Sequence, residues 1–144
     1  MLSSIDQRIF KMPQYVVLHH RGTLGKTMPR GAQDHFDWMF EHGDSLLTWA
    51  TDALPSKTSP SQLPAIQLPN HRTHYLTFQG SLSGDRGELE RVETGTFELV
   101  RTNDAHYEFA VTGDRIGIVL LQKIHLGVDS TWDWSFRPTR ADAS

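Results

Sequence analysis

The fold is decided by one stretch that alternates without a break, His35-Phe36-Asp37-Trp38-Met39-Phe40-Glu41. Successive side chains of a β-strand point to opposite faces, so the three aromatic rings of this stretch share one face. His35 and Asp37 share the other face with Glu41, and Met39 is the one apolar residue among them. The alternation predicts a strand whose aromatic face enters a core, while an imidazole and a carboxylate point together the other way.

The regions on either side of this stretch indicate further short strands. A turn at residues 42–45 follows it, and the apolar run 46–50 completes a hairpin. A strand is also expected before it, at residues 14–20. Later strand candidates, separated by turn residues, are 74–79, 88–93, 96–101, 106–112, 115–123 and 132–137. Roughly eight short strands at this spacing predict an all-β fold, a small antiparallel β-barrel with little helix.

The 144 residues give room for one domain. We expect residues 1–11 to be a disordered extension, 12–138 to form the single barrel domain and 139–144 to be a flexible tail. Residues 21–34 combine glycines, a proline and basic side chains, which predicts a loop. Residues 52–69 hold four prolines and several serines, which predicts a long connection over the surface.

Composition and charge exclude several classes of function. Hydrophobic residues make up 38% and charged residues 22%, as in a globular protein with a core. Cysteine is absent, which excludes a disulfide framework, a thiolate nucleophile and a Cys-ligated zinc or iron–sulfur site. The net charge of −3 disfavours extended binding along a duplex, but it allows a pocket for one phosphate or one strand end.

The sequence gives no sign of membrane attachment. No apolar run approaches the roughly 20 residues of a membrane span, and no signal-peptide pattern opens the chain. We therefore expect a cytoplasmic, monomeric protein without membrane contact.

Eight histidines point to metal or proton chemistry. On one strand face, His35 and Asp37 can grip a single cation, and this ligand mix suits Mn, Fe, Zn or Co. His20, at the end of the preceding strand, is the nearest third ligand, whereas His19 faces the other way. Glu41 can orient a ligand histidine or serve as a surface carboxylate. From spacing alone, the pair His35 and Asp37 can equally be a solvent-facing pair on an amphipathic edge.

Seven segments in a fixed order carry a resemblance to a known family. They are Tyr15-Val16-Val17-Leu18-His19-His20, the alternating stretch 35–41, Leu47-Thr48-Trp49, the run 71–80 that begins His71-Arg72-Thr73-His74-Tyr75, Gly84-Asp85-Arg86-Gly87-Glu88, Glu93-Thr94-Gly95-Thr96-Phe97-Glu98 and Trp132-Asp133-Trp134. Together they resemble the 3′-phosphoesterase domain at the N-terminus of bacterial DNA ligase D. The similarity covers residues 13–137, and it is carried by the ordered set rather than by any single motif.

The resemblance implies a β-barrel with a divalent metal in a polar crater, manganese above all, with zinc or cobalt as alternatives. It implies an enzyme of DNA repair or end joining that removes a 3′-phosphate or a terminal ribonucleotide from a DNA or RNA-primed strand. By position, His20, His35 and Asp37 match the metal ligands. His71 matches the histidine that acts on the phosphate, and Tyr75 matches the tyrosine beside it. The chain has no Lys-x-Asp-Gly ligase motif, so a ligase or polymerase would be a separate chain.

The sequence departs from the family pattern at two arginine positions. Met39 stands where the family strand has an arginine, and Leu63 falls near a second such position. Methionine lacks the guanidinium fork that clamps phosphate. The basic residues Arg21, Lys26, Arg30 and Arg72 could restore the charge, but their type and setting favour a solvated surface role for each.

Two other function classes remain open at this point. A catalytically degenerate barrel would keep the His/Asp crater and bind a nucleic-acid end or a repair partner. A non-haem Fe(II) oxygenase would combine His35 and Asp37 with a distant histidine and an arginine, an arrangement that His125 and Arg137 mimic. Dependence on 2-oxoglutarate and iron would identify the oxygenase, and phosphate release from a 3′-phosphorylated primer would separate the enzyme from the degenerate barrel.

Overall fold

The computed structural model describes residues 12–21, 34–81, 87–103, 105–127 and 131–139. Its strands are β1 (Gln14–Arg21), β3 (His35–His42), β4 (Ser45–Thr51), β5 (Ser61–Arg72), β6 (Gly80–Ser81), β7 (Glu88–Asn103), β8 (His106–Gly113), β9 (Gly117–His125) and β10 (Thr131–Pro138). A turn of 3-10 helix, η1 (Thr73–Leu76), follows β5. The extension predicted at 1–11, most of the loop predicted at 21–34 and most of the predicted tail lie outside the described residues.

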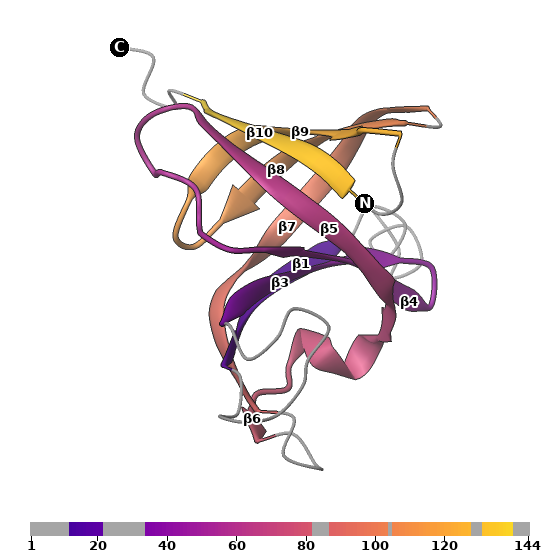
Figure 1. Ribbon diagram of the computed structural model, residues 1–144, viewed down its shortest axis with the longest axis vertical. Helices are drawn as coiled ribbons and strands as arrows, with labels where there is room; N and C mark the ends of the chain where they lie inside the picture. The colour runs from indigo at the N-terminus through magenta and orange to yellow at the C-terminus, as the bar shows by residue number, and fades with distance from the viewer. Residues whose placement is uncertain (1–11, 22–33, 82–86, 104, 128–130, 140–144) are drawn as a thin grey trace, which may run out of the picture.

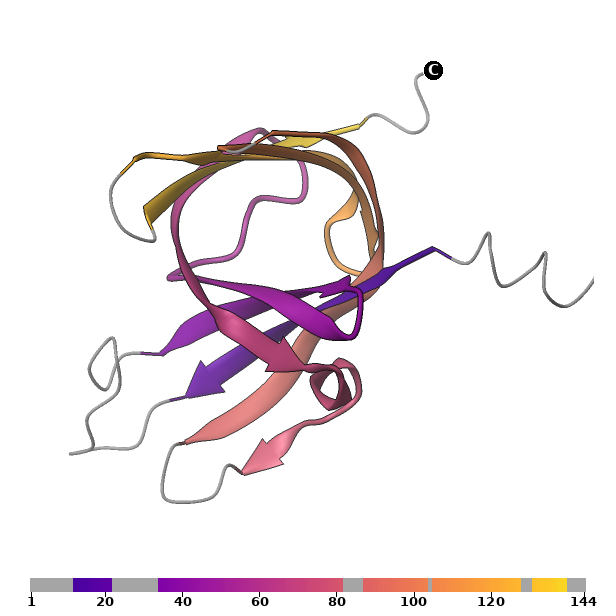
Figure 2. The ribbon, with the colours of Figure 1, turned by 90° about the vertical axis from the view of Figure 1, so that its right-hand side faces the viewer.

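These strands form one antiparallel sheet that closes on itself. The order is β1-β3-β4-β5-β10-β9-β8-β7-β6, and β7 pairs with β1 as well. Eight strands therefore form a barrel, and the short β6 adds to the free part of β7. The strands curve around an enclosed interior, with η1 outside it (Figures 1 and 2). The predicted all-β barrel is confirmed, and the described residues contain no α-helix.

Aromatic side chains fill the barrel interior. Trp38 and Phe40 of the alternating stretch are fully buried there, as predicted, and Phe36 is partly buried against the same cluster. From β4 and β10, Trp49 and Trp134 meet edge to face, with their ring centroids 5.7 Å apart. Such ring pairs add about 0.5–1.5 kcal/mol each beyond the burial of their area.

The side chain of Lys123 is buried among these rings. The Nζ of Lys123 lies 3.5 Å from the ring centroid of Phe40 and 3.6 Å from that of Trp49. Phe109 and Trp134 complete the cage at 4.5 and 4.3 Å. This Nζ has no hydrogen-bond partner among the described residues, and burial lowers the pKa of Lys123 well below its ordinary value. No pattern in the sequence predicts this residue inside the core.

A second, smaller apolar cluster lies on the outer face of the barrel. Val16, Leu18 and Leu89 belong to it, together with Leu46 and Met39. Aromatic and aliphatic side chains of η1 and the residues after it pack onto this cluster, namely Tyr75, Leu76 and Phe78. Met39, which looked out of place on a polar face, is therefore buried under η1, with 1% of its surface exposed.

Residues 61–72 form a strand where the sequence predicted the later part of a proline-rich surface connection. The twelve residues of β5 pair with β10 on one side and with β4 on the other. Pro69 falls where the register with β4 shifts and beyond the end of the pairing with β10. A proline is tolerated at such a bulge because the ladder does not need its missing N–H there.

The two strands predicted at 88–93 and 96–101 are one strand, β7, of sixteen residues. Thr94-Gly95 does not turn the chain. Gly95 instead lies where β7 pairs with both β1 and β8. A Cβ there would come within 2.1 Å of the Thr112 carbonyl oxygen and 2.9 Å of the Tyr15 ring. The glycine therefore serves close packing between neighbouring strands, which a sequence pattern does not distinguish from a turn.

The strand predicted at 74–79 is also absent, because this segment begins as η1. The rings of His74 and Tyr75 lie 4.1 Å apart, and Phe78 closes the group against both. The turn of 3-10 helix places Tyr75, Leu76 and Phe78 over the outer cluster. This packing takes the place of the strand pairing that was predicted for the segment.

Candidate metal centre

Two predicted ligands lie opposite each other on neighbouring strands. His20 of β1 pairs in register with His35 of β3, and their ring centroids are 4.8 Å apart. Asp37 comes two residues later on β3 and therefore shares the outer face. Nδ1 of His20 lies 3.4 Å from Oδ2 of Asp37, and Nε2 of His35 lies 3.2 Å from Oδ1. One ligand atom from each residue lies within 4.8 Å of the other two.

The carboxylate at the centre of this group is buried and incompletely satisfied. Asp37 and His35 each expose only 4% of their surface. Burial by itself would raise the pKa of Asp37, but the imidazoles of His20 and His35 hold the pKa below its ordinary value. Oδ1 of Asp37 has no hydrogen-bond partner among the described residues, although the His35 ring is close. The two imidazoles are therefore the groups that face this buried carboxylate.

This donor set fits a divalent cation. Nitrogen and carboxylate ligands bind such ions at about 2.0–2.2 Å, so neighbouring ligand atoms stand roughly 3 Å apart. The two distances to the Asp37 oxygens are close to that value. Two imidazoles with one carboxylate suit Mn, Fe, Zn or Co and leave coordination positions for other groups.

Gly87 and Arg21 shape the edge of the metal centre. A Cβ on Gly87, whose φ is +103°, would meet the carbonyl oxygen of Arg21 at 2.0 Å and Nε2 of His20 at 3.3 Å. Only glycine lets β7 begin this close to the end of β1. Arg21 donates to Glu90 at 2.6 Å and lies 3.9 Å from Glu88. Its charge is therefore engaged by carboxylates of the same barrel.

His71 and Tyr75 lie farther along the same outer face. His71 of β5 pairs with Leu46 of β4, which in turn pairs with Glu41 of β3. Along β3, Glu41 is four residues from Asp37, or about 13 Å. Nδ1–H of His71 donates to the carbonyl oxygen of Pro69 at 2.8 Å, and its ring meets that of Tyr75 at 5.5 Å. The two residues are brought together, but no described hydrogen bond, ion pair or ring contact joins them to the metal-ligand cluster.

Glu41 and His19 have partners of their own. Oε1 of Glu41 accepts a hydrogen bond from the backbone N–H of Gln14 at 2.6 Å. The histidine pair lies six residues away along β3, about 20 Å, so Glu41 does not orient a ligand histidine as one prediction held. His19 faces away from the cluster, as predicted. Its ring stacks on Phe36 at 4.7 Å, and its Nε2 lies 3.5 Å from Asp34.

Of the basic residues considered from the sequence, the two that the structure describes, Arg21 and Arg72, do not bring a free charge to the cluster. Arg21 pairs with Glu90, and Arg72 is exposed at the far end of β5. Lys26 and Arg30 lie outside the described residues. Sequence reasoning did not single out Arg91 of β7, which pairs in register with an outer-face residue of β1. Only the partnership of β7 with β1, which no local pattern reveals, would have identified it.

The oxygenase arrangement is not formed. His125 lies at the end of β9, where it pairs with Trp132 and contacts its ring at 5.1 Å. The histidine that joins His35 and Asp37 is His20, from the adjacent strand β1. Arg137 is exposed on β10, which is not a neighbour of β1 or β3.

Comparison with known protein families and with curated proteins found no match to this chain. Among the described residues, no helix is long and apolar enough to cross a membrane. The likeness to the ligase D phosphoesterase domain therefore stays a prediction from the sequence.

Proposed function

We propose that this protein is a divalent-metal-dependent phosphoesterase that acts on the 3′ end of a nucleic-acid strand. The observation that carries the proposal is the cluster of His20, His35 and Asp37, in which one ligand atom of each residue lies within 4.8 Å of the other two. The closed β-barrel supports it, because the resemblance to the ligase D domain implies such a barrel. The proposed reaction is hydrolysis that releases a 3′-phosphate or a terminal ribonucleotide and leaves a 3′-hydroxyl.

The three residues of the cluster have distinct tasks in this proposal. Asp37 supplies an anionic oxygen at neutral pH, because its pKa is held below the ordinary value. His20 offers Nδ1 and His35 offers Nε2, the nitrogens that face the carboxylate. Manganese, when bound by this set, supplies Lewis-acid polarisation of a phosphoryl group. The rigid pairing of β1 with β3 fixes all three donors before substrate arrives.

His71 has one defined proton position. Its Nδ1 carries the proton, because the Pro69 carbonyl oxygen can only accept. Nε2 is consequently the atom that can exchange a proton with substrate or stabilise charge on a phosphoryl oxygen. The ring of Tyr75, at 5.5 Å, restrains the imidazole from the side. The resemblance assigns His71 to the phosphate and Tyr75 to its positioning. Because His71 stands about 13 Å along the sheet from Asp37, it would meet a phosphate other than the one at the cluster.

The substrate and partners follow from charge and motif content. A net charge of −3 suits a site that holds one strand end rather than a length of duplex. Because the sequence has no ligase motif, we place ligation and polymerisation on separate chains of a repair or end-joining assembly.

The test is manganese-dependent phosphate release from a 3′-phosphorylated DNA primer. We expect release by the wild-type protein and a loss of at least about 100-fold in His35→Ala. The matched control is His42→Ala, on the same strand but exposed at the hairpin to β4. Equal rates in the wild type and in His35→Ala would remove the cluster from the mechanism.

A second candidate is a barrel that binds strand ends without turnover. Met39 favours it, because the residue at the family's arginine position is buried under η1 instead of facing a phosphate. In this case the wild-type protein would bind a 3′-phosphorylated primer but release no phosphate with manganese, zinc or cobalt. The same primer assay, read once as binding and once as release, separates the two candidates.

A further inference from the structure

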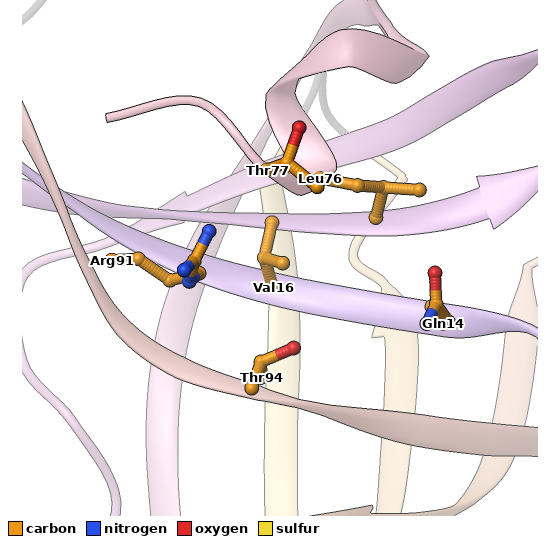
Figure 3. Close-up of a pocket in the computed structure, with 6 residues that line it drawn as sticks. All are labelled: Gln14, Val16, Leu76, Thr77, Arg91 and Thr94. Atoms are coloured by element: carbon orange, nitrogen blue, oxygen red, sulfur yellow. The ribbon is translucent and has the colours of Figure 1, made fainter. Parts of the chain in front are cut away.

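An open cleft lies on the outer face of the barrel, between β1, β7 and the end of η1 (Figure 3). It has a volume of about 220 Å³. Its lining consists of Gln14, Val16, Leu76, Thr77, Arg91 and Thr94. Val16 and Leu76 belong to the outer apolar cluster, and Arg91 is the charged residue of this lining. The cleft thus combines an apolar wall with a cation and two hydroxyls.

The register of the barrel places Arg91 beside the metal centre. Arg91 of β7 pairs with Leu18 of β1, and Leu18 pairs with Asp37 of β3. Paired residues of antiparallel strands point to the same face, so all three side chains face outward in one row. Two strand spacings of about 4.8 Å separate the backbones of Arg91 and Asp37. The Arg91 end of the cleft therefore lies two strands from Asp37, on the same outer face of the barrel.

The charge of Arg91 is available to an anion. Among the described residues, no carboxylate lies within 4.0 Å of its guanidinium, whereas Arg21 is engaged by Glu90. The backbone N–H of Arg91 donates to Oε1 of Gln79 at 3.0 Å, which ties the chain after η1 to β7. The carboxylate of Glu41 is held at the Gln14 end of the cleft. An anion entering the cleft meets its cation at the other end, beside the metal centre.

We propose that Arg91 binds the phosphodiester next to the terminal phosphate, with Thr94 and Thr77 as neighbouring hydroxyl partners. This inference rests on the proposed function, since it places the terminal phosphate at the cluster that contains Asp37. The guanidinium fork matches two phosphate oxygens at once. The substrate is then a strand of at least two nucleotides, and mononucleotides are poor substrates. Arg91 supplies, from another strand, the cation that Met39 does not.

Binding to the metal-free protein tests Arg91 directly. The probe is a labelled DNA oligonucleotide with a 3′-hydroxyl, which has internal phosphodiesters but no terminal phosphate, and binding is read by fluorescence anisotropy in EDTA. We expect Arg91→Ala to weaken binding about 10- to 100-fold. The slope of log K against log salt should fall by about 0.7, the value for one lost contact on a single strand. Arg91→Lys should recover part of the affinity, because it keeps the charge but not the fork.

The matched control is Arg137→Ala, which removes an exposed arginine from β10, a strand that does not border the cleft. It should bind like the wild type. In the processing assay with manganese, Arg91→Ala should raise KM for a 3′-phosphorylated oligonucleotide. KM for a nucleoside 3′-phosphate, which has no neighbouring phosphodiester, should stay unchanged. Wild-type affinity and salt slope in Arg91→Ala would overturn this inference, even if wild-type processing upholds the phosphoesterase. Arg91-dependent binding without any processing would overturn the phosphoesterase alone, and an absence of both would overturn both.

Discussion

The two faces of β3 border buried titratable groups of opposite kinds. The inner face contributes Phe40 to the aromatic cage around Lys123, whose amine has no hydrogen-bond partner among the described residues. The outer face contributes Asp37, which lies between two imidazoles. Burial is nearly complete in both places. The surroundings differ: aromatic rings contact the amine of Lys123, whereas two imidazole nitrogens face the carboxylate of Asp37.

This difference shows which buried polar group indicates a site. Among the described residues, no hydrogen-bond acceptor meets the amine of Lys123, and the side chain is fully buried. Lys123 is therefore out of reach of a ligand, and its burial lowers stability. The outer cluster brings three ligand atoms within 4.8 Å of one another, so an added cation can stabilise it. Lys123 and Asp37 both have a pKa lowered from its ordinary value, so a shifted pKa does not by itself indicate a site. The arrangement of ligand atoms around Asp37 is what distinguishes a candidate site from a destabilising buried amine.

The largest expected effect comes from removing the buried amine. Lys123→Met keeps an unbranched side chain in the cage and should raise the free energy of unfolding by about 3 kcal/mol, the cost of an unpaired buried polar group. Urea unfolding should show a higher midpoint with an unchanged m-value. The control is Lys57→Met, at an exposed position, which should stay within about 0.5 kcal/mol. A less stable Lys123→Met would mean that the rings favour the amine over a thioether.

The second effect is stabilisation of the outer cluster by metal. At a manganese concentration one hundred times Kd, the unfolding free energy should rise by about 2.7 kcal/mol, because the ion binds only the folded protein. Thermal unfolding with and without manganese measures this. His35→Ala should abolish the increase, and His42→Ala should retain it. Stabilisation that survives in His35→Ala would locate the bound ion elsewhere.

The third effect is a rise of the unfolding free energy with pH, caused by the buried amine of Lys123. The unfolded chain carries a protonated Lys123 up to about pH 10.4, whereas burial disfavours that proton in the fold. The unfolded state thus binds more protons, and the unfolding free energy should rise by up to about 1.4 kcal/mol per pH unit between pH 8 and 10. The groups facing the amine, such as Phe40 and Trp49, do not titrate.

Above pH 10 the trend should reverse because of Tyr15. Burial, and then the carboxylate of Glu93 that accepts its hydroxyl at 2.7 Å, raise the pKa of Tyr15. The unfolded chain then loses a proton that the fold keeps, so stability falls with pH. Urea midpoints at each pH should show a maximum near pH 10 in the wild type and no rise from pH 8 in Lys123→Met. A rise that persists in Lys123→Met would assign it to another group.

The barrel and the ligand cluster were predictable for one reason. Alternation with period two is local, so residues 35–41 sufficed to put His35 and Asp37 on one face, and the preceding strand made His20 the nearest third ligand. The register that sets His20 opposite His35 is visible only in the structure. The same argument gave the aromatic core face of Trp38 and Phe40. These inferences needed only the direction of side chains along adjacent strands.

The remaining features depend on distant strands. Pro69 is tolerated because of a bulge against β4, and Gly95 is required by the approach of β1 and β8. The outward place of Arg91 and the inward place of Lys123 likewise follow from pairings of β7 and β9 that span much of the sequence. Composition and period do not encode such pairings, so one residue of interest inside the barrel and one outside it were both missed.

The smallest expected effect concerns an exposed charge pair beside the metal centre. Arg21 and Glu90 are each about half exposed, so Arg21→Ala should lower the unfolding free energy by less than about 1 kcal/mol. Because Glu90 engages its guanidinium at 2.6 Å, oligonucleotide affinity should change less than in Arg91→Ala. Urea unfolding and the anisotropy assay, run on both variants, measure the contrast. A larger affinity loss in Arg21→Ala would place the strand over the open end of β1 and away from the cleft.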